Sequence, residues 1–186
     1  PGVLDRLGFG SARRQALAPS LIHVAITAWG QTGPYRDRAG HDLNAMALGG
    51  GLDLAGDGEG PHFACPPIAD HACGLQAALA VTAALAGRGQ GGESAGRFID
   101  VSMMETVLAW QALPLNWAAA GQPAARGRDL LTGGAACYRL YATADGRFIA
   151  VGAIEAKFWA ALCRALGQPG WTGRQWEPMP QDSLIS

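Results

Sequence analysis

Apolar positions along the chain fall into short runs typical of strands and longer runs with helical spacing. The run Leu21–Thr27 has strand length, and the glycine- and proline-rich stretch Gly30–Tyr35 ends it in a tight turn. Apolar residues at helical spacing follow Gly40, which predicts a short helix beginning at His41. The imidazole of His41 is therefore expected beside a crevice beyond the strand's end.

A longer run of small apolar residues follows two prolines. Residues from His71 to about Ala86 predict a helix of roughly four turns, with Asp70 immediately before it and pointing outward. Because large polar side chains are nearly absent, this helix is expected to be buried against a sheet or a partner chain.

The second half of the chain changes from helices to antiparallel strands. The expected elements are a strand over Phe98–Val101, a helix to about Leu113, a hairpin from Tyr138 to Val151 and a helix opened by Glu155 and ended by Gly167. The change predicts a domain boundary near residue 125, which divides the chain into residues 1–125 and 126–186.

Composition narrows the choice of partners. The chain has 186 residues, is 49% hydrophobic and carries a net charge of −1, so a basic face for nucleic acid or anionic membrane is not expected. No apolar run looks long enough to span a bilayer. The four cysteines show no CxxC spacing, which favours reduced core thiols in a cytoplasmic protein over zinc or disulfides. The chain reads as part of a longer protein that binds a small ligand.

Three titratable residues are expected at helix starts: His41, Asp70 and Glu155. Removing the weakly acidic α-proton of a thioester needs a base and donors for the enolate oxygen, and free N–H groups at a helix start can be those donors. His41 and Asp70 form a plausible pair that inverts the carbon. Asp70 alone can instead attack an acyl thioester as a nucleophile. On spacing alone, however, all three are ordinary helix caps or first-turn residues.

Five stretches resemble a known family. They are Gly30–Tyr35 (GQTGPY), Gly40–Asn44 (GHDLN), Ile68–Asp70 (IAD), Ile99–Glu105 (IDVSMME) and Tyr141–Glu155 (YATADGRFIAVGAIE). In this order they resemble the class III coenzyme A transferase (CaiB/BaiF) family, and within it the alpha-methylacyl-CoA racemase branch. The resemblance extends to about Gly167.

The resemblance implies an α/β fold. Family members are about twice this length, with a Rossmann-like large domain, a smaller α+β domain and two interlocked chains. This chain would then hold part of the large domain and the start of the small one, as a fragment of an interlocked homodimer.

The resemblance also implies roles. His41 and Asp70 match the family's acid/base pair, and Glu155 matches a glutamate that supports the site. Contacts to coenzyme A are implied for Arg6 and for the backbone of Gly40, His41, Asp42, Leu43, Asn44 and Ala45. Coenzyme A enters as part of an acyl-CoA substrate, so no permanently bound cofactor and no metal are expected.

The chain departs from the racemase pattern at the acyl pocket. Ala45 stands where an aromatic residue is usual, and His71, Ala72 and Cys73 stand where an aromatic residue and glycines are usual. Three functions stay open: a racemase of 2-methylacyl-CoA, a CoA-transferase that uses Asp70 as nucleophile, and a CoA-binding or dimerisation segment without turnover. A short glycine run at Gly133–Gly134 favours the racemase.

Overall fold

The computed structural model describes residues 1–89 and 95–186, which form two compact units. The first unit holds residues 1–51 and 64–112, and the second holds residues 52–63 and 113–186. The loop 52–63 joins the second unit because the Arg126 guanidinium donates hydrogen bonds to the carbonyls of Asp53 (2.9 Å) and Leu52 (3.3 Å). The domains expected over residues 1–125 and 126–186 stay a prediction.

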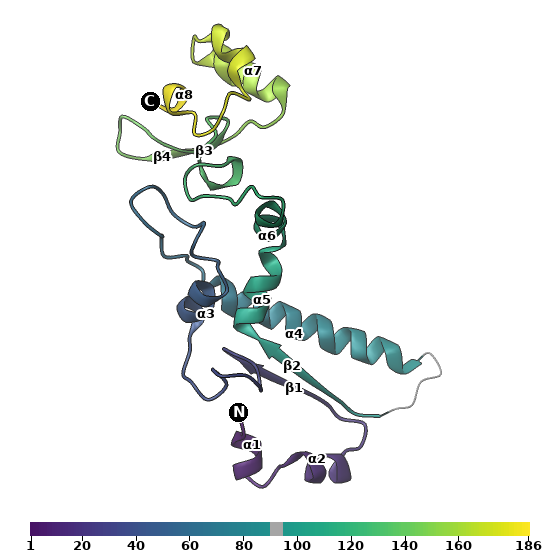
Figure 1. The fold of residues 1–186 in the computed structure, drawn as a ribbon. Helices are drawn as coiled ribbons and strands as arrows, with labels where there is room; N and C mark the ends of the chain where they lie inside the picture. The colour runs from purple at the N-terminus through teal and green to yellow at the C-terminus, as the bar shows by residue number, and fades with distance from the viewer. Residues whose placement is uncertain (90–94) are drawn as a thin grey trace. The chain divides into compact units, whose positions relative to one another are not determined.

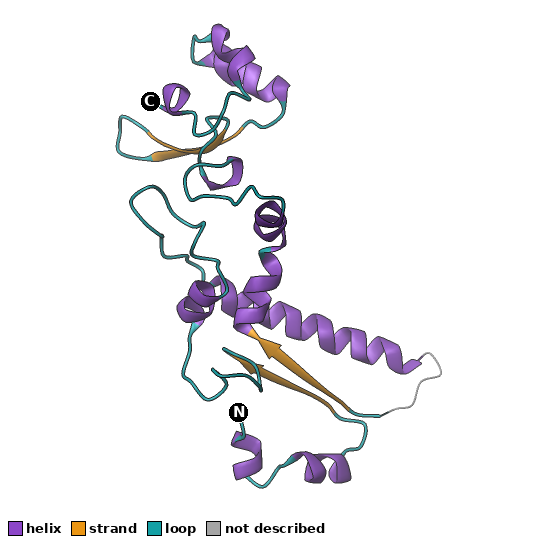
Figure 2. Ribbon diagram, in the orientation of Figure 1, coloured by secondary structure: helices purple, strands orange, loops and turns teal. Residues whose placement is uncertain are grey.

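The first unit is a parallel strand pair with helices (Figures 1 and 2). Strands β1 (Ile22–Thr27) and β2 (Arg97–Ser102) pair in register from Ile22 opposite Arg97 to Thr27 opposite Ser102. The helices are α1 (Val3–Arg6), α2 (Ser11–Leu17), α3 (Asp42–Leu48), α4 (Ile68–Ala86) and α5 (Met103–Trp110). Helix α4 lies alongside the strand pair and makes the crossover that parallel strands require. Both predicted strands and the helix start at His41 are confirmed.

Helix α4 is buried on one face only. Its small side chains Ala69, Ala72 and Ala77 are buried, whereas Leu75 and Leu79 are 68% and 64% exposed. By length and composition α4 is able to cross a membrane, which the sequence reading had not expected, although core helices of soluble proteins meet the same criterion. The expectation of a fully buried helix is correct for the alanine face alone.

The chain turns from one helix to another beside Pro114. Helix α5 is capped by Ser102, whose Oγ accepts a hydrogen bond from the Glu105 N–H (3.2 Å). It ends at Trp110, and helix α6 (Ala112–Ala119) follows directly. The helix that follows Ser102 thus ends before Pro114 as predicted, three residues earlier than Leu113. Helix α6 was not predicted; it tolerates Pro114 because a proline in a first turn lacks only an N–H that the helix does not use.

The second unit packs an antiparallel hairpin with helices. Strands β3 (Tyr138–Ala142) and β4 (Phe148–Gly152) pair with Tyr138 opposite Gly152, which confirms the predicted hairpin. The remaining elements are α7 (Ala156–Ala165), α8 (Asp182–Ile185) and short 3-10 helices at Leu130–Thr132 and Pro169–Arg174. Glu155 is the N-cap residue of α7, as expected.

A small core holds the second unit together. Buried Trp159 and Cys163 of α7 pack with Ala135–Cys137 and with Leu184. The Trp159 indole donates a hydrogen bond to the carbonyl of Trp171 (3.1 Å). Apolar burial and a satisfied indole N–H thus fix α7 against the C-terminal segment.

Two buried glutamines bind the C-terminal segment to the same core. The Gln175 side chain donates to the Ala153 and Ile154 carbonyls, at 3.2 and 2.7 Å. The Gln181 amide accepts from the Ala136 N–H (3.0 Å) and donates to the backbone. These bonds satisfy polar groups that burial would otherwise leave unpaired.

The cysteines agree only partly with the predicted core thiols. All four are free, and Cys73, Cys137 and Cys163 are buried, but Cys65 is exposed. Burial raises the pKa of the Cys73 thiol, which keeps it protonated at neutral pH. Cys65 precedes the prolines before α4, where the chain runs over the surface.

The loop between β1 and α3 folds around aromatic rings. The rings of Trp29 and Tyr35 lie 5.6 Å apart, and the Arg38 guanidinium lies 5.2 Å from the Tyr35 ring. A Cβ on Gly40 would lie 2.7 Å from both Trp29 Cζ2 and Ala28 Cβ, closer than atoms can pack. Glycine at position 40 therefore lets the chain pass the indole and reach His41.

Trp159→Ala should lower the free energy of unfolding of the second unit by about 3–5 kcal/mol, because it leaves a cavity and an unpaired Trp171 carbonyl. Urea unfolding followed by circular dichroism measures the change. Trp176→Ala, at a residue 57% exposed, is the matched control and should have little effect. Equal losses in the two variants would contradict this core.

Gly40→Ala should lower the free energy of unfolding by about 1–3 kcal/mol, because the added methyl group overlaps the Trp29 ring. The same denaturation experiment measures it. Gly74→Ala is the control: its Cβ meets nothing within 4 Å, and it should raise stability by up to about 1 kcal/mol through helix propensity. A Gly40→Ala protein as stable as Gly74→Ala would exclude the close packing.

Candidate active site

The turn after β1 is held by hydrogen bonds to its backbone. The Gly30 N–H donates to Thr27 Oγ1 (2.9 Å), and the Gln31 N–H donates to Asp100 Oδ2 on β2 (2.7 Å). Gly30 and Gly33 both have a φ of +84°, a conformation that favours glycine. The GQTGPY stretch is therefore a fixed turn that leads the chain toward α3.

His41 ends that loop as the N-cap residue of α3. Its backbone is extended, with φ −124° and ψ 177°, and its N–H donates to Asn44 Oδ1 (3.1 Å). Its carbonyl accepts the first helical hydrogen bond from the Ala45 N–H (3.1 Å). The imidazole is exposed, and with the Asn44 side chain it forms a capping box at the start of α3. The first turn of α3 thus fixes where the His41 ring lies, and the ring stays exposed to solvent.

Asp70 is not the cap of its helix. Helix α4 begins at Ile68, three residues earlier than expected from the sequence, so Asp70 lies within the first turn. The N-cap residue is Pro67, whose side chain cannot accept a hydrogen bond. Within the described residues, the exposed Asp70 carboxylate has no hydrogen-bond or ion-pair partner. The interpretation of Asp70 as an ordinary N-cap residue is therefore excluded.

The cap of α4 comes from another helix. Asp42 Oδ1 accepts hydrogen bonds from the Ala69 N–H (2.6 Å) and the Asp70 N–H (3.1 Å). We call this arrangement the Asp42 clamp. The negative charge of Asp42 also lies at the positive end of the α4 dipole, where it is stabilising. The expectation of free N–H donors is wrong for Ala69 and Asp70, because Asp42 occupies them.

The Asp42 clamp brings two of the predicted site residues together. Asp42 directly follows His41 in the sequence and binds the backbone N–H of Asp70. His41 and Asp70 consequently lie on the adjoining starts of α3 and α4, and both side chains are exposed. An imidazole and a carboxylate so placed can serve as proton carriers, and the carboxylate can also attack an electrophile.

The structure places the other predicted residues less closely. Glu155 belongs to the second unit, and its role in the site stays a prediction. Arg6 ends α1 and is exposed, and none of the hydrogen bonds or ion pairs of the described residues joins it to His41 or Asp70. Ala45 is fully buried, and its N–H donates a hydrogen bond to the His41 carbonyl (3.1 Å). Neither the side chain nor the N–H of Ala45 is therefore free to contact a ligand. Leu43 and Asn44 are exposed, and Gly40 is half-buried.

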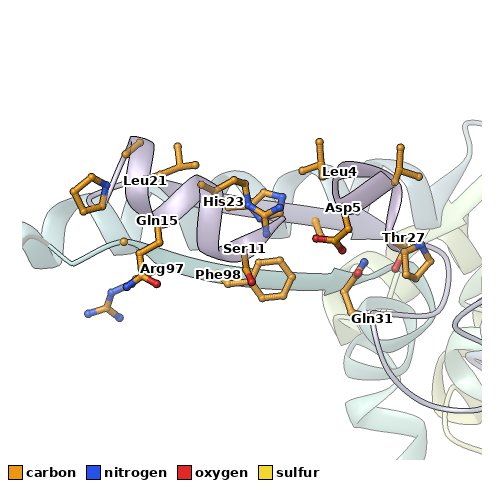
Figure 3. Close-up of a pocket in the computed structure, with 18 of the residues that line it drawn as sticks. Leu4, Asp5, Ser11, Gln15, Leu21, His23, Thr27, Gln31, Arg97 and Phe98 are labelled. Atoms are coloured by element: carbon orange, nitrogen blue, oxygen red, sulfur yellow. The ribbon is translucent and has the colours of Figure 1, made fainter. Parts of the chain in front are cut away.

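A separate hollow of about 780 Å³ lies beside β1, between α1, α2 and the start of β2 (Figure 3). His23 lines it, with its ring 5.1 Å from that of Phe98. Burial, and then the charge of Arg14, lower the pKa of His23, which favours a neutral ring at pH 7. Neither His41 nor Asp70 lines this hollow, so His23 is not part of the candidate site.

Sequence reasoning missed the role of the Asp42 side chain. A signal for it exists, because Cys65-Pro66-Pro67 before α4 contains none of the usual N-cap residues. The acceptor for the first turn must then come from elsewhere in the chain. Among the described residues, no group of three or more His, Cys, Asp and Glu side chains is arranged to hold a metal ion.

The relatives of the chain point to chemistry on coenzyme A thioesters. Human alpha-methylacyl-CoA racemase is 38% identical over 174 residues, which cover 89% of this chain and 44% of the racemase. Succinyl-CoA–D-citramalate CoA-transferase of Chloroflexus aurantiacus is 33% identical over 171 residues, which cover 91% of this chain and 42% of the transferase.

A solved structure of a CaiB/BaiF family protein matches the fold of this chain. The CaiB/BaiF family protein from Brucella suis superposes with a TM-score of 0.72 at 28% identity, covering 92% of this chain and 45% of that one. The chain thus spans less than half the length of these relatives. The model of CoA-transferase family III matches residues 1–183. With the α/β fold and the matched motifs, this shows that the chain belongs to CoA-transferase family III.

Proposed function

We propose that the protein at its natural length is an acyl-CoA racemase that inverts the α-carbon of a 2-methylacyl-CoA thioester. His41 and Asp70 exchange the α-proton through an enolate, one removing it and the other returning it. The observation that carries the proposal is the Asp42 clamp, which joins the helix starts of His41 and Asp70 through backbone N–H groups and leaves both side chains exposed. The identity of 38% to human alpha-methylacyl-CoA racemase supports it.

Further parts of the proposal rest on the family resemblance. Glu155 supports the site, and Arg6 binds the coenzyme A part of the substrate, because a guanidinium pairs well with phosphate. Coenzyme A arrives with the acyl group, so the proposal needs no resident cofactor. We place the enzyme in the cytoplasm as a homodimer.

A CoA-transferase is the second candidate. In that reaction the Asp70 carboxylate attacks the thioester carbonyl, the C–S bond breaks, and the acyl group stays on Asp70 as a mixed anhydride while coenzyme A leaves as the thiolate. The exposed and unpartnered Asp70 carboxylate favours it, as does the similarity to the Chloroflexus transferase. A segment that binds coenzyme A without turnover is the non-enzymatic alternative.

In deuterium oxide, the protein should incorporate deuterium at the α-carbon of 2-methylacyl-CoA, measured by mass spectrometry. His41→Ala and Asp70→Ala should each slow the exchange about 10²-fold or more, the usual contribution of an acid/base group. His62→Ala and Asp145→Ala remove exposed side chains of the same kinds from the second unit and should leave it unchanged.

His41→Ala also distinguishes the racemase from the CoA-transferase. Full CoA transfer by His41→Ala, with hydroxylamine trapping of an acyl group on Asp70, would replace the racemase by the transferase. Absence of both exchange and transfer at natural length would leave the non-enzymatic alternative.

A further inference from the structure

One carboxylate joins the two helix starts of the candidate site. Asp42 is the first residue of α3, and its Oδ1 lies 2.6 Å from the Ala69 nitrogen and 3.1 Å from the Asp70 nitrogen in the first turn of α4. Asp42 itself is half-buried. Asp42 directly follows His41, one proposed proton carrier, and accepts a hydrogen bond from the backbone of Asp70, the other.

The residues that precede α4 supply no side-chain acceptor in place of Asp42. Pro67, at the N-cap position of α4, has no side-chain acceptor, and the His71 ring contacts the Pro67 carbonyl instead (2.7 Å). Helices α3 and α4 contact each other, and each has a fully buried alanine in or next to its first turn, Ala45 and Ala69. Burial of alanine side chains does not set the orientation of a helix's first turn as two directional hydrogen bonds do.

We propose that Asp42 is a positioning residue, which sets the separation of His41 and Asp70 by holding the first turn of α4 to the start of α3. This inference rests on the proposed function. Asp42 is assigned no direct contact with the substrate in it, since Asp42 Oδ1 accepts hydrogen bonds from the Ala69 and Asp70 N–H groups. Its effect on the reaction passes through Asp70, whose backbone it fixes.

The test compares Asp42→Ala, Asp42→Asn and Asp42→Glu at natural length. Asp42→Ala should lower kcat for α-proton exchange about 100-fold with KM changed less than about threefold, because small misplacements of reacting groups cost catalysis rather than binding. Asp42→Asn keeps the accepting oxygen and should recover about tenfold of that loss, since a neutral acceptor makes a weaker bond. Asp145→Ala removes another backbone-capping carboxylate and is the matched control.

Hydrogen–deuterium exchange of residues 67–72 gives a reading that does not depend on activity. The Ala69 and Asp70 amides should exchange faster in Asp42→Ala than in the wild type, Asp42→Asn and Asp145→Ala. Wild-type kcat in Asp42→Ala, equal kcat in Asp42→Ala and Asp42→Asn, or unchanged amide exchange would each overturn the proposal.

If Asp42→Ala does not fold, Asp42→Glu tests the proposal instead. Glutamate keeps the charge but is one methylene longer, so kcat should fall at unchanged KM. A wild-type kcat in Asp42→Glu would overturn the proposal. If the wild type itself exchanges no α-proton, the proposed function is overturned. The amide exchange then still decides separately whether Asp42 holds the two helix starts together.

Discussion

The hydrogen bonds from α4 to Asp42 are the contact on which the arrangement of the first unit's candidate site depends. A helix start leaves backbone N–H groups without helical partners, and burying them unpaired is costly. Because prolines precede α4, the acceptor comes from α3, 27 residues before Ala69. Satisfying the backbone of one helix thereby fixes the start of another. His41 and Asp70 are neighbours as a result of this requirement, without bonding each other.

Several apolar side chains of the first unit remain exposed to solvent. Leu75 and Leu79 on α4 and Phe98 on β2 remain 55–68% exposed, and parallel strands are ordinarily covered on both faces. This exposure accords with a chain that spans 44% of the racemase it matches. The first unit thus holds a complete strand–helix–strand crossover, while much of its apolar surface stays uncovered.

Family membership narrows the chemistry without choosing the reaction. A racemase and a CoA-transferase, both named for CoA thioesters, appear among the relatives. Among the described residues, the Asp70 carboxylate has no partner, which suits either of the two proposed reactions. In the proposal, the His41 imidazole separates the two reactions, because a proton carrier is needed to invert a carbon and is not needed to form an anhydride.

The local pattern of the sequence determined much of the fold. The apolar run before Gly30, the glycine at position 40 and the hairpin turn predicted β1, the start of α3 and the pair β3–β4, because these elements depend on neighbours in the chain. The roles expected for His41 and Asp70 came from the family resemblance, since spacing alone did not distinguish them from caps.

Only the tertiary structure decided which side chain caps α4 and which residues complete the second core. The Asp42 carboxylate reaches a helix 27 residues away, and Gln181 reaches Ala136 across 45 residues, so no local pattern encodes either contact. The sequence by itself determined β1, the start of α3, the hairpin β3–β4 and the chemical groups that they carry. Their pairing was decided by the need to give each buried N–H a partner, and that partner depends on how distant segments pack.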